Sequence, residues 1–437
     1  MSNQKYLLQC VVCGHKTPDF GAWFEQNQVC PTCGSKHSEV WYQTDYTKLH
    51  ELMKGEVLSF WQYLPFLPLI NAGNIVTCTE GGIPVQQWDF LEEFAKKQYG
   101  LDIRVHVYRN DLNGGTGTFK DVAASLAASI FKEYGVKQYC VASTGNTATS
   151  YATYLSMAGV NCSVFLPDNA LKASEAFVSA FGQQVFRVKG DYAKTKVIAA
   201  GYSNTHHILM SAGNIDPIRV EAKKTMVFEW LRQMGKMPDV YIQAVSGGTG
   251  PIAIDKGVRE IQSVYPDLKN PRFIMIQPDK CDPMVQAWDK AEKNNFPNNY
   301  EKDYPIIDNP ETAIPTLATG HPATYPIIAK LVKASNGSFI SISEDKIADF
   351  SRLIAYERKV MLGPASAVCI SGFFRALKKG LIRDGETVLL NVGEGVRRAP
   401  EFVVEMLYAS KDVDRVDQCT PHTMQSYRSQ LWDAVID

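Results

Sequence analysis

The sequence predicts an α/β fold whose sheets are mostly parallel and buried on both faces. Two observations carry this prediction. Short apolar runs alternate with helix-length segments between about residues 46 and 400, and the chain of 437 residues, 45% of them hydrophobic, is long enough for two or three domains with a large core. Strands that alternate with helices form βαβ units, whose parallel strands are covered by helices on either side.

In chain order, an apolar run is followed by a helical segment in four places. The predicted strands 103–109, 138–143, 162–167 and 239–246 precede the predicted helices 119–134, 148–159, 173–182 and 251–265, respectively. Two further runs, 272–278 and 387–393, predict additional strands. Residues 401–410 predict a helix, and a polar tail follows from residue 411.

The charge balance excludes some classes of partner. Forty-five Lys and Arg residues against 46 Asp and Glu residues leave a formal net charge of −1, which offers no basic surface for a nucleic acid. No apolar run approaches the roughly 20 residues needed to span a bilayer. The first residues show no positive segment followed by a long apolar one, so a secretory signal is not expected. We expect a cytoplasmic protein without nucleic-acid or membrane partners.

Four of the ten cysteines form two CxxC pairs near the start of the chain, Cys10 with Cys13 and Cys30 with Cys33. Two such pairs supply the four thiolates that a structural zinc ion prefers. Gly14 and Gly34 close the two turns and allow main-chain N–H groups to approach the sulfurs. The spacing therefore predicts a zinc ribbon over residues 1–45, with a metal-free ribbon or a redox pair as alternatives.

A glycine-rich loop places Lys120 at the start of a predicted helix. The segment Asn113–Asp121 lies between a strand and an apolar helix, and its three glycines allow the backbone to approach a ligand closely. A lysine in the first helical turn faces the positive end of the helix dipole, which lowers the pKa of its amine and favours the nucleophilic form. Taken alone, this placement favours a solvated loop lysine over a nucleophile, and the other loops shift the balance.

Two other loops follow predicted strands and open predicted helices. The segment Ser143–Thr147 carries an asparagine, and the segment Ser246–Gly250 carries the free N–H groups that bind phosphate at helix N-termini. The second loop has neither the Gly-Lys-Ser/Thr of a Walker loop nor GxGxxG spacing. A phosphate-binding turn, an asparagine and an activated lysine together suit pyridoxal 5′-phosphate (PLP).

The order of these motifs resembles that of the fold-type II PLP enzymes, and within them threonine synthase, from about residue 59 to 400. GTGTFKD (115–121) resembles PTGSFKD, which carries the coenzyme's lysine, and ASTGNT (142–147) resembles SSGNT. DPIRVEAKKTMVFE (216–229) resembles NPxRxEGQKTxxFE. The other matching segments, in the same order along the chain, are SFWQYLP (59–65), TEGGIPV (79–85), SGGTG (246–250), IQPDKCDPMVQAW (276–288), ATGHP (318–322), GPASAV (363–368) and NVGEGVRR (391–398).

This resemblance implies a fold like that of the tryptophan synthase β chain, with two open parallel-sheet domains behind the four-cysteine zinc ribbon. The large PLP-binding domain would comprise residues 46–135 and 240–410, the small α/β domain residues 136–239, and the C-terminal tail residues 411–437. The resemblance also implies a homodimer that acts on a small amino-acid substrate.

The resemblance further assigns roles to individual residues. Lys120 would hold the coenzyme covalently and move protons. The other cofactor-binding residues would be Phe119 beside the ring, Asn146 at its 3′-oxygen, Ser246, Gly247, Gly248, Thr249 and Gly250 at its phosphate, and Asn391. The substrate-binding residues would be Thr116, Thr118, Ser143, Thr144, Thr147 and Arg219.

The sequence departs from threonine synthase mainly at expected substrate contacts. Asp216 replaces an asparagine and would repel a substrate phosphate, whereas Lys223 adds a positive charge near Arg219. Val392 occupies the position of a hydroxyl near the pyridine nitrogen, where Asn391 is a candidate substitute. Ser174, Phe177 and Ile83 replace other family residues.

Three functions follow from these observations. The first is a PLP-dependent lyase that converts O-phosphohomoserine and water to threonine and phosphate, as threonine synthase does. The second is a β-replacement or elimination enzyme on another amino acid, similar to cysteate synthase or cysteine synthase. The third is a non-catalytic PLP or zinc-ribbon protein, which the presence of Lys120, Asn146 and the glycine turn argues against.

Overall fold

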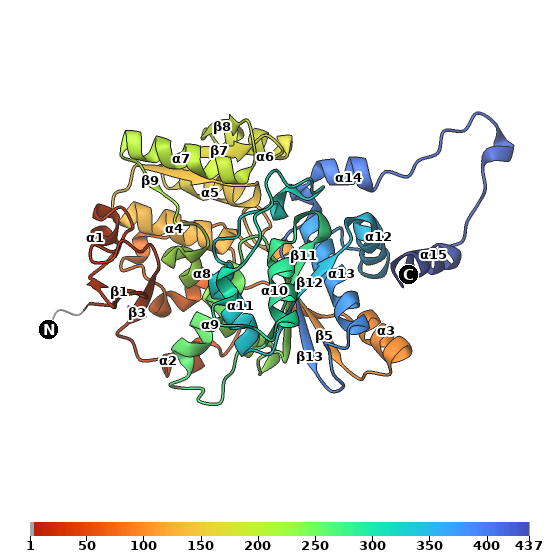
Figure 1. Cartoon of the computed structure of the whole chain (residues 1–437), viewed down its shortest axis with the longest axis horizontal. Helices are drawn as coiled ribbons and strands as arrows, with labels where there is room; N and C mark the ends of the chain where they lie inside the picture. Colours follow the sequence, from red (N-terminus) through yellow and green to blue (C-terminus); the bar gives the residue numbers. More distant parts are fainter. Residues whose placement is uncertain (1–3, 437) are drawn as a thin grey trace.

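Three sheets organise the computed structural model of the chain, which describes residues 4–436 (Figure 1). The N-terminal sheet has the order β2-β1-β3 and is antiparallel. Its strands are β1 (Tyr6–Cys10), β2 (Lys16–Thr17) and β3 (Ser38–Tyr42), and the short helix α1 (Phe20–Glu25) connects β2 to β3. The segment α2 (Lys48–Leu52) then leads into the larger domains.

The large sheet has the order β12-β11-β10-β13-β5-β4. Every strand pair in it is parallel except the pair of β4 and β5 at the edge. Its strands are β4 (Val85–Gln87), β5 (Arg104–Arg109), β10 (Val240–Ala244), β11 (Arg272–Pro278), β12 (Ser338–Ile342) and β13 (Thr387–Val392). Its central strands are buried along nearly their whole length, as expected for a sheet covered on both faces.

The small sheet has the order β8-β7-β6-β9 and is parallel throughout. Its strands are β6 (Gln138–Ala142), β7 (Asn161–Pro167), β8 (Gln184–Val188) and β9 (Leu209–Met210). The α/β class with two parallel-sheet units is therefore confirmed. The predicted runs 103–109, 138–143, 162–167, 239–246, 272–278 and 387–393 correspond to β5, β6, β7, β10, β11 and β13.

Helices cover both sheets, and the four predicted helices are present. They are α4 (Asp121–Glu133), α5 (Asn146–Met157), α6 (Lys172–Ala180) and α9 (Thr249–Ile261). The sequence patterns missed α3 (Asp89–Tyr99), α7 (Tyr192–His206), α8 (Pro217–Met234), α10 (Pro283–Lys293), α11 (Tyr325–Ala334), α12 (Ile347–Arg358) and α13 (Pro364–Lys378). Helix α8 is buried on nearly every side, so it lacks the one-sided apolar pattern of a surface helix.

The core of the small sheet extends beyond the predicted small domain. Apolar side chains of α4, such as Phe131, pack with Tyr139 of β6 and with Trp23 and Leu8 of the N-terminal ribbon. Helix α4, which the resemblance places in the large domain, thus shares its core with the small sheet. The ribbon is packed into this core rather than attached as a separate module.

The C-terminal region contains a helix that packs on the body of the protein, although its polar sequence did not predict one. Helix α14 (Pro400–Met406) corresponds to the predicted helix, and an exposed segment then runs away from the body before α15 (Met424–Ile436) returns to it (Figure 1). Leu431 and Val435 of α15 are buried, and Trp432 stacks on Phe94 with ring centroids 5.1 Å apart. Among the described residues, no helix combines the length and apolar character needed to cross a membrane.

Candidate active site

A cavity opens where strands of both sheets end, the position at which parallel α/β sheets bind ligands. Ser143 follows β6, Ser246 follows β10, and Gly393 follows β13. The residues that line this cavity are Phe119, Lys120, Ser143, Thr144, Asn146, Thr147, Tyr192, Asn214, Arg219, Lys223, Gln243, Ala244, Ser246, Gly247, Gly248, Thr249, Thr316, Leu317, Thr319, Ala365, Asn391, Gly393 and Glu394.

Lys120 projects into this cavity from the N-cap position of α4. Its Nζ lies 5.1 Å from the ring centroid of Phe119, and no residue in the described part of the chain accepts a hydrogen bond from it. Burial lowers the pKa of the Lys120 amine to about 8, with Arg219 acting in the same direction and Glu394 opposing it. The amine is therefore partly neutral near physiological pH, as a nucleophile requires.

A glycine turn at the start of α9 forms one wall of the cavity. No acceptor among residues 4–436 bonds the main-chain N–H of Gly247, Gly248 or Thr249, as expected at a helix N-terminus that awaits an anion. Gly248 has φ +71°, and a Cβ at Gly247 would lie 1.8 Å from Nδ2 of Asn214. Side chains are thus excluded from this turn, which leaves its N–H groups accessible to a phosphate.

The loop Ser143–Thr147 forms a second wall and begins α5. The Ser143 hydroxyl accepts hydrogen bonds from the N–H groups of Gly145 and Ala148, both at 3.1 Å, and so fixes the loop. Asn146 donates a hydrogen bond from its side chain to the carboxylate of Glu394. Asn146, which the resemblance assigns to the 3′-oxygen of the coenzyme, is therefore hydrogen-bonded to Glu394 in this structure.

Glu394 is the acidic residue that lines the cavity, and the sequence analysis did not single it out. Its side chain is buried, and its Oε1 accepts a hydrogen bond of 3.0 Å from the N–H of Ala365. Burial raises the pKa of the Glu394 carboxyl, although Asn146 and Lys120 oppose that shift. Its place in the sequence, directly after the predicted strand 387–393 and within the matched segment NVGEGVRR (391–398), was the available signal.

Helix α8 contributes two basic side chains to the cavity. The Nε of Arg219 donates to the hydroxyl of Tyr151 at 3.2 Å, and its Nη2 is buried with no partner among the described residues. Lys223 lies one helical turn further along, with its Nζ 4.6 Å from the ring centroid of Phe119. Both side chains are almost fully buried, and both line the cavity.

Asp216, expected to repel a substrate phosphate, does not line the cavity. It is the N-cap residue of α8, and its Oδ1 accepts a hydrogen bond of 3.0 Å from the N–H of Ile218. Its carboxylate therefore stabilises the helix that carries Arg219. Because this carboxylate lies outside the cavity, it does not contact an anion bound there.

Thr116, Thr118 and Gly250 are not among the lining residues. The Thr116 hydroxyl donates to Asp121 Oδ1 at 2.6 Å, and the N–H of Thr118 donates to Asp121 Oδ2 at 2.8 Å. These hydrogen bonds fix the loop that precedes Lys120. The two threonines therefore support this loop and do not contact a ligand in the cavity. Burial raises the pKa of the Asp121 carboxyl to about 6, and its hydrogen bonds to Thr116 and Thr118 give this residue a structural role in the loop.

The residues around the expected ring-nitrogen position divide between cavity and core. Asn391 lines the cavity, and its Oδ1 accepts a hydrogen bond of 2.7 Å from Asn110. Val392 is fully buried in the core that surrounds the large sheet. Three other positions that depart from the family lie outside the lining, namely Ile83, Ser174 and Phe177.

The sequence analysis also missed lining residues that come from loops and from inside strands. They are Tyr192, Asn214, Gln243, Ala244, Thr316, Leu317, Thr319, Ala365 and Gly393. Thr319, Ala365 and Gly393 lie in segments that resemble family motifs, whereas the others carry no local motif and reach the cavity only through the packing of distant segments. Thr316 has a buried hydroxyl with no partner within the described chain, a further polar atom available to a ligand.

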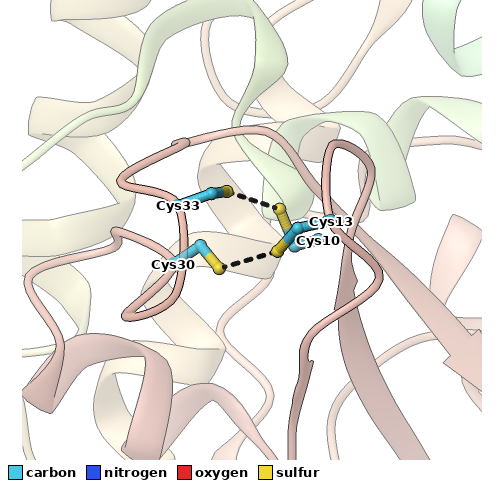
Figure 2. A group of neighbouring side chains, drawn as sticks. All are labelled: Cys10, Cys13, Cys30 and Cys33. Carbon is cyan, nitrogen blue, oxygen red and sulfur yellow. Dashed lines mark hydrogen bonds between the residues drawn. The ribbon is translucent and has the colours of Figure 1, made fainter.

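The four paired cysteines converge in the N-terminal ribbon (Figure 2). The sulfur atoms lie within 4.8 Å of one another, and the Cys10–Cys33 and Cys13–Cys30 pairs are each 3.5 Å apart. Four thiolates bound to zinc at about 2.3 Å in a tetrahedron are separated by about 3.8 Å. The arrangement therefore has the donor set and the spacing of a structural zinc site, with no open position for a substrate.

Comparison with known proteins identifies the family. Residues 76–393 match the family model described as "Pyridoxal-phosphate dependent enzyme". The threonine synthase of Methanocaldococcus jannaschii is 28% identical over 400 residues, which cover 90% of this chain and 93% of that protein. The threonine synthase of Methanosarcina acetivorans is 26% identical over 416 residues, with 94% and 96% covered.

Solved structures show the same fold at low identity. A cysteine synthase from Entamoeba histolytica superimposes with a TM-score of 0.58 at 15% identity and covers 82% of this chain and 93% of its own. O-ureido-L-serine synthase gives a TM-score of 0.58 at 14% identity, with 80% and 99% covered. The chain therefore belongs to the family of pyridoxal-phosphate dependent enzymes, in which it is a fold-type II lyase similar to threonine synthase.

Proposed function

We propose that this enzyme converts O-phosphohomoserine and water to threonine and phosphate. The observation that carries the proposal is the cavity that joins the amine of Lys120, the N–H groups of the Gly247–Thr249 turn and Nη2 of Arg219. None of these groups has a hydrogen-bond partner within residues 4–436. Two anion-binding positions and one amine match a phosphorylated coenzyme and a phosphorylated amino acid. The similarity to threonine synthases over nine-tenths of the chain supports the same reaction.

The residues present fit PLP. The turn at Gly247, Gly248 and Thr249, together with Ser246, would hold its phosphate, because this turn excludes side chains and offers unbonded N–H groups. Lys120 would hold its aldehyde carbon, Phe119 would lie beside its ring, and Asn146 and Asn391 would contact its polar atoms. When bound, the coenzyme stabilises negative charge that develops on the substrate's α-carbon.

The protein's own groups then bind and orient the substrate. Ser143, Thr144 and Thr147 line the same side of the cavity as the N-terminus of α5, whose N–H groups favour a carboxylate. Arg219 is placed to bind the phosphate, since its Nη2 has no other partner among the described residues. The amine of Lys120 accepts the α-proton, which its pKa of about 8 allows near neutral pH.

We further propose that the cysteine cluster binds a structural zinc ion and that the enzyme is a cytoplasmic homodimer. The converging thiols support the first statement. The second rests on the resemblance to fold-type II enzymes.

The test begins with the purified protein and PLP. Borohydride reduction followed by peptide mapping should place the coenzyme on Lys120, and K120A should bind no coenzyme covalently. The loaded enzyme is then given O-phosphohomoserine, O-acetylserine or O-phosphoserine in parallel, and phosphate, acetate and amino-acid products are measured. Threonine and phosphate in equal amounts support the proposal. Turnover of only the serine esters would instead establish a β-replacement enzyme, and a protein that ignores PLP would establish a binding protein.

A further inference from the structure

Helix α8 places two successive lysines in opposite surroundings. Lys224 is fully buried, and its Nζ lies 2.5 Å from Glu221 and 2.6 Å from Glu260. Lys223 is also almost fully buried, but it lies on the cavity side of the helix and has no carboxylate or hydrogen-bond partner among the residues described. A buried amine without a counter-ion is costly to maintain, so its presence in a ligand cavity suggests a function.

The amines of Lys223 and Lys120 approach the same part of the cavity from two different helices. Their Nζ atoms lie 4.6 Å and 5.1 Å, respectively, from the ring centroid of Phe119. Lys120 comes from the N-terminus of α4, whereas Lys223 comes from the second turn of α8, beside Arg219. Two amines that reach one cavity from different directions can act on different carbons of the same bound substrate.

The other potential bases that line the cavity are already engaged. The carboxylate of Glu394 accepts hydrogen bonds from Asn146 and Ala365. The hydroxyl of Ser143 accepts two main-chain hydrogen bonds within its own loop. Besides Lys120, Lys223 is the basic side chain that lines the cavity without a hydrogen-bond partner among the described residues.

The charges that face Lys223 favour its neutral form. Burial lowers the pKa of the Lys223 amine well below its usual value, and Lys120 and Arg219 lower it further. Asp216 at the start of the same helix opposes this effect, and Glu394 across the cavity is engaged by Asn146. A neutral amine is suited to accept a proton, whereas an anion-binding lysine would need to remain protonated.

We propose that Lys223 is a second acid–base residue, which carries a proton from the β-carbon of the substrate to its γ-carbon. This inference rests on the proposed function, because that reaction requires such a transfer. The C–O bond at the γ-carbon breaks and its electron pair leaves with phosphate. The β-carbon loses one proton and gains the hydroxyl of water, the γ-carbon gains one proton, and the remaining proton of water passes to solvent. Lys223 is protonated after the first transfer and neutral again after the second.

The activity test separates the α-proton step from the later steps. Wild-type enzyme, K223M and K223R are loaded with PLP and given O-phosphohomoserine in deuterated water, and both α-deuterium exchange and phosphate release are followed. We expect K223M to bind the coenzyme and to exchange the α-proton within about threefold of wild type, while phosphate release falls by roughly 10²–10⁴-fold. K223R should not restore release, because its guanidinium remains protonated.

Chemical rescue distinguishes a proton carrier from a residue that only supports the cavity. Phosphate release by K223A should rise with the concentration of added methylamine, and the effect should grow with pH as more of the amine becomes neutral. Full phosphate release in K223M, or restored release in K223R, would overturn the proposal. The second result would instead assign Lys223 to anion binding.

A third measurement does not depend on the substrate. The pH dependence of acetylation at Lys223 in the coenzyme-free protein, read by peptide mass spectrometry, should show a midpoint below the usual value of 10.5. A Lys223 that becomes reactive only near 10.5 would contradict the proposal even if threonine is formed. A wild-type enzyme that forms no threonine would contradict the proposed function instead, whatever the reactivity of Lys223.

Discussion

Asn146 and Glu394 are joined by a hydrogen bond across the active-site cavity, between the first residue of α5 and the loop after β13. The bond connects the small sheet to the large one at the place where the coenzyme's ring would lie. Glu394 also raises the pKa of Lys120, so one carboxylate acts on two of the residues that the proposed function requires. The charge of Glu394 is therefore expected to set the pH at which Lys120 becomes reactive.

Replacing Glu394 with glutamine should lower the pKa of Lys120 below its value of about 8. A carboxylate stabilises the protonated amine, and the neutral amide removes that stabilisation while it still accepts a hydrogen bond from Asn146. The rate of PLP attachment to E394Q should therefore reach half its maximum at a pH lower by up to about one unit. An unchanged midpoint in E394Q would show that Glu394 does not act on Lys120.

Replacing Gly248 with alanine should weaken coenzyme binding at least about tenfold and destabilise the fold by roughly 1–2 kcal/mol. Gly248 has φ +71°, and an added Cβ would lie 2.1 Å from Cδ1 of Ile328, so the turn must shift. G201A is the matched control, because Gly201 lies in α7 with open space around its Cβ position. It should leave PLP affinity unchanged and stabilise the protein by about 0.5–1 kcal/mol. Titration with PLP and denaturant unfolding measure both quantities, and equal affinities in the two variants would refute the role of the turn.

The neighbouring variants K224M and K223M should change the free energy of unfolding in opposite directions. Loss of Lys224 leaves the buried carboxylates of Glu221 and Glu260 with Lys256 alone, and we expect a destabilisation of roughly 3–5 kcal/mol. Loss of Lys223 removes a buried amine that has no counter-ion among the described residues, and we expect the coenzyme-free protein to become more stable near neutral pH. Denaturant unfolding of the two variants beside wild type measures both changes, and a loss of stability in K223M would contradict this expectation.

The pH dependence of the K223M effect follows from the direction of its pKa shift. The folded-state pKa of Lys223 is depressed, so the folded protein is destabilised at any pH where the unfolded chain holds this proton more tightly. The gain from K223M should therefore be fully present below the folded pKa and vanish as the pH rises through 10.5. A gain that persists unchanged above that pH would point to packing rather than charge.

Replacing Cys30 with serine should reduce zinc from about one ion per chain to a small fraction and should lower the melting temperature. Trp23 and Leu8 of the ribbon pack in the same core as Phe131 of α4, so loss of the metal should destabilise the domain that carries Lys120. C419S is the control, because Cys419 is exposed and remote from the cluster. Atomic absorption and thermal unfolding provide the two readouts. Equal zinc content in C30S and C419S would exclude the proposed metal site.

Periodicity and turn residues predicted the strands and the helices α4, α5 and α9 that build the active site, but not helices α7, α8 and α13, which also contribute lining residues. Strands such as β6 and β10 were evident because strands buried on both faces are nearly continuous apolar runs. Helix α8 was missed because it is enclosed on nearly every side, and α15 was missed because only Leu431 and Val435 of its length are buried. In both helices, the segments that pack against the helix determine which of its residues are buried, and the sequence shows no one-sided apolar pattern.

By itself, the sequence determined the α/β class, the cysteine cluster and the position of Lys120 before its helix, since each depends on residues close together in the chain. Only the tertiary structure decided that Lys223 faces the cavity while Lys224 faces a buried pair of carboxylates, and that Asp216 caps a helix instead of meeting a ligand. The direction of a side chain in a fully buried helix depends on what packs against each side, and those groups come from segments far apart in the sequence.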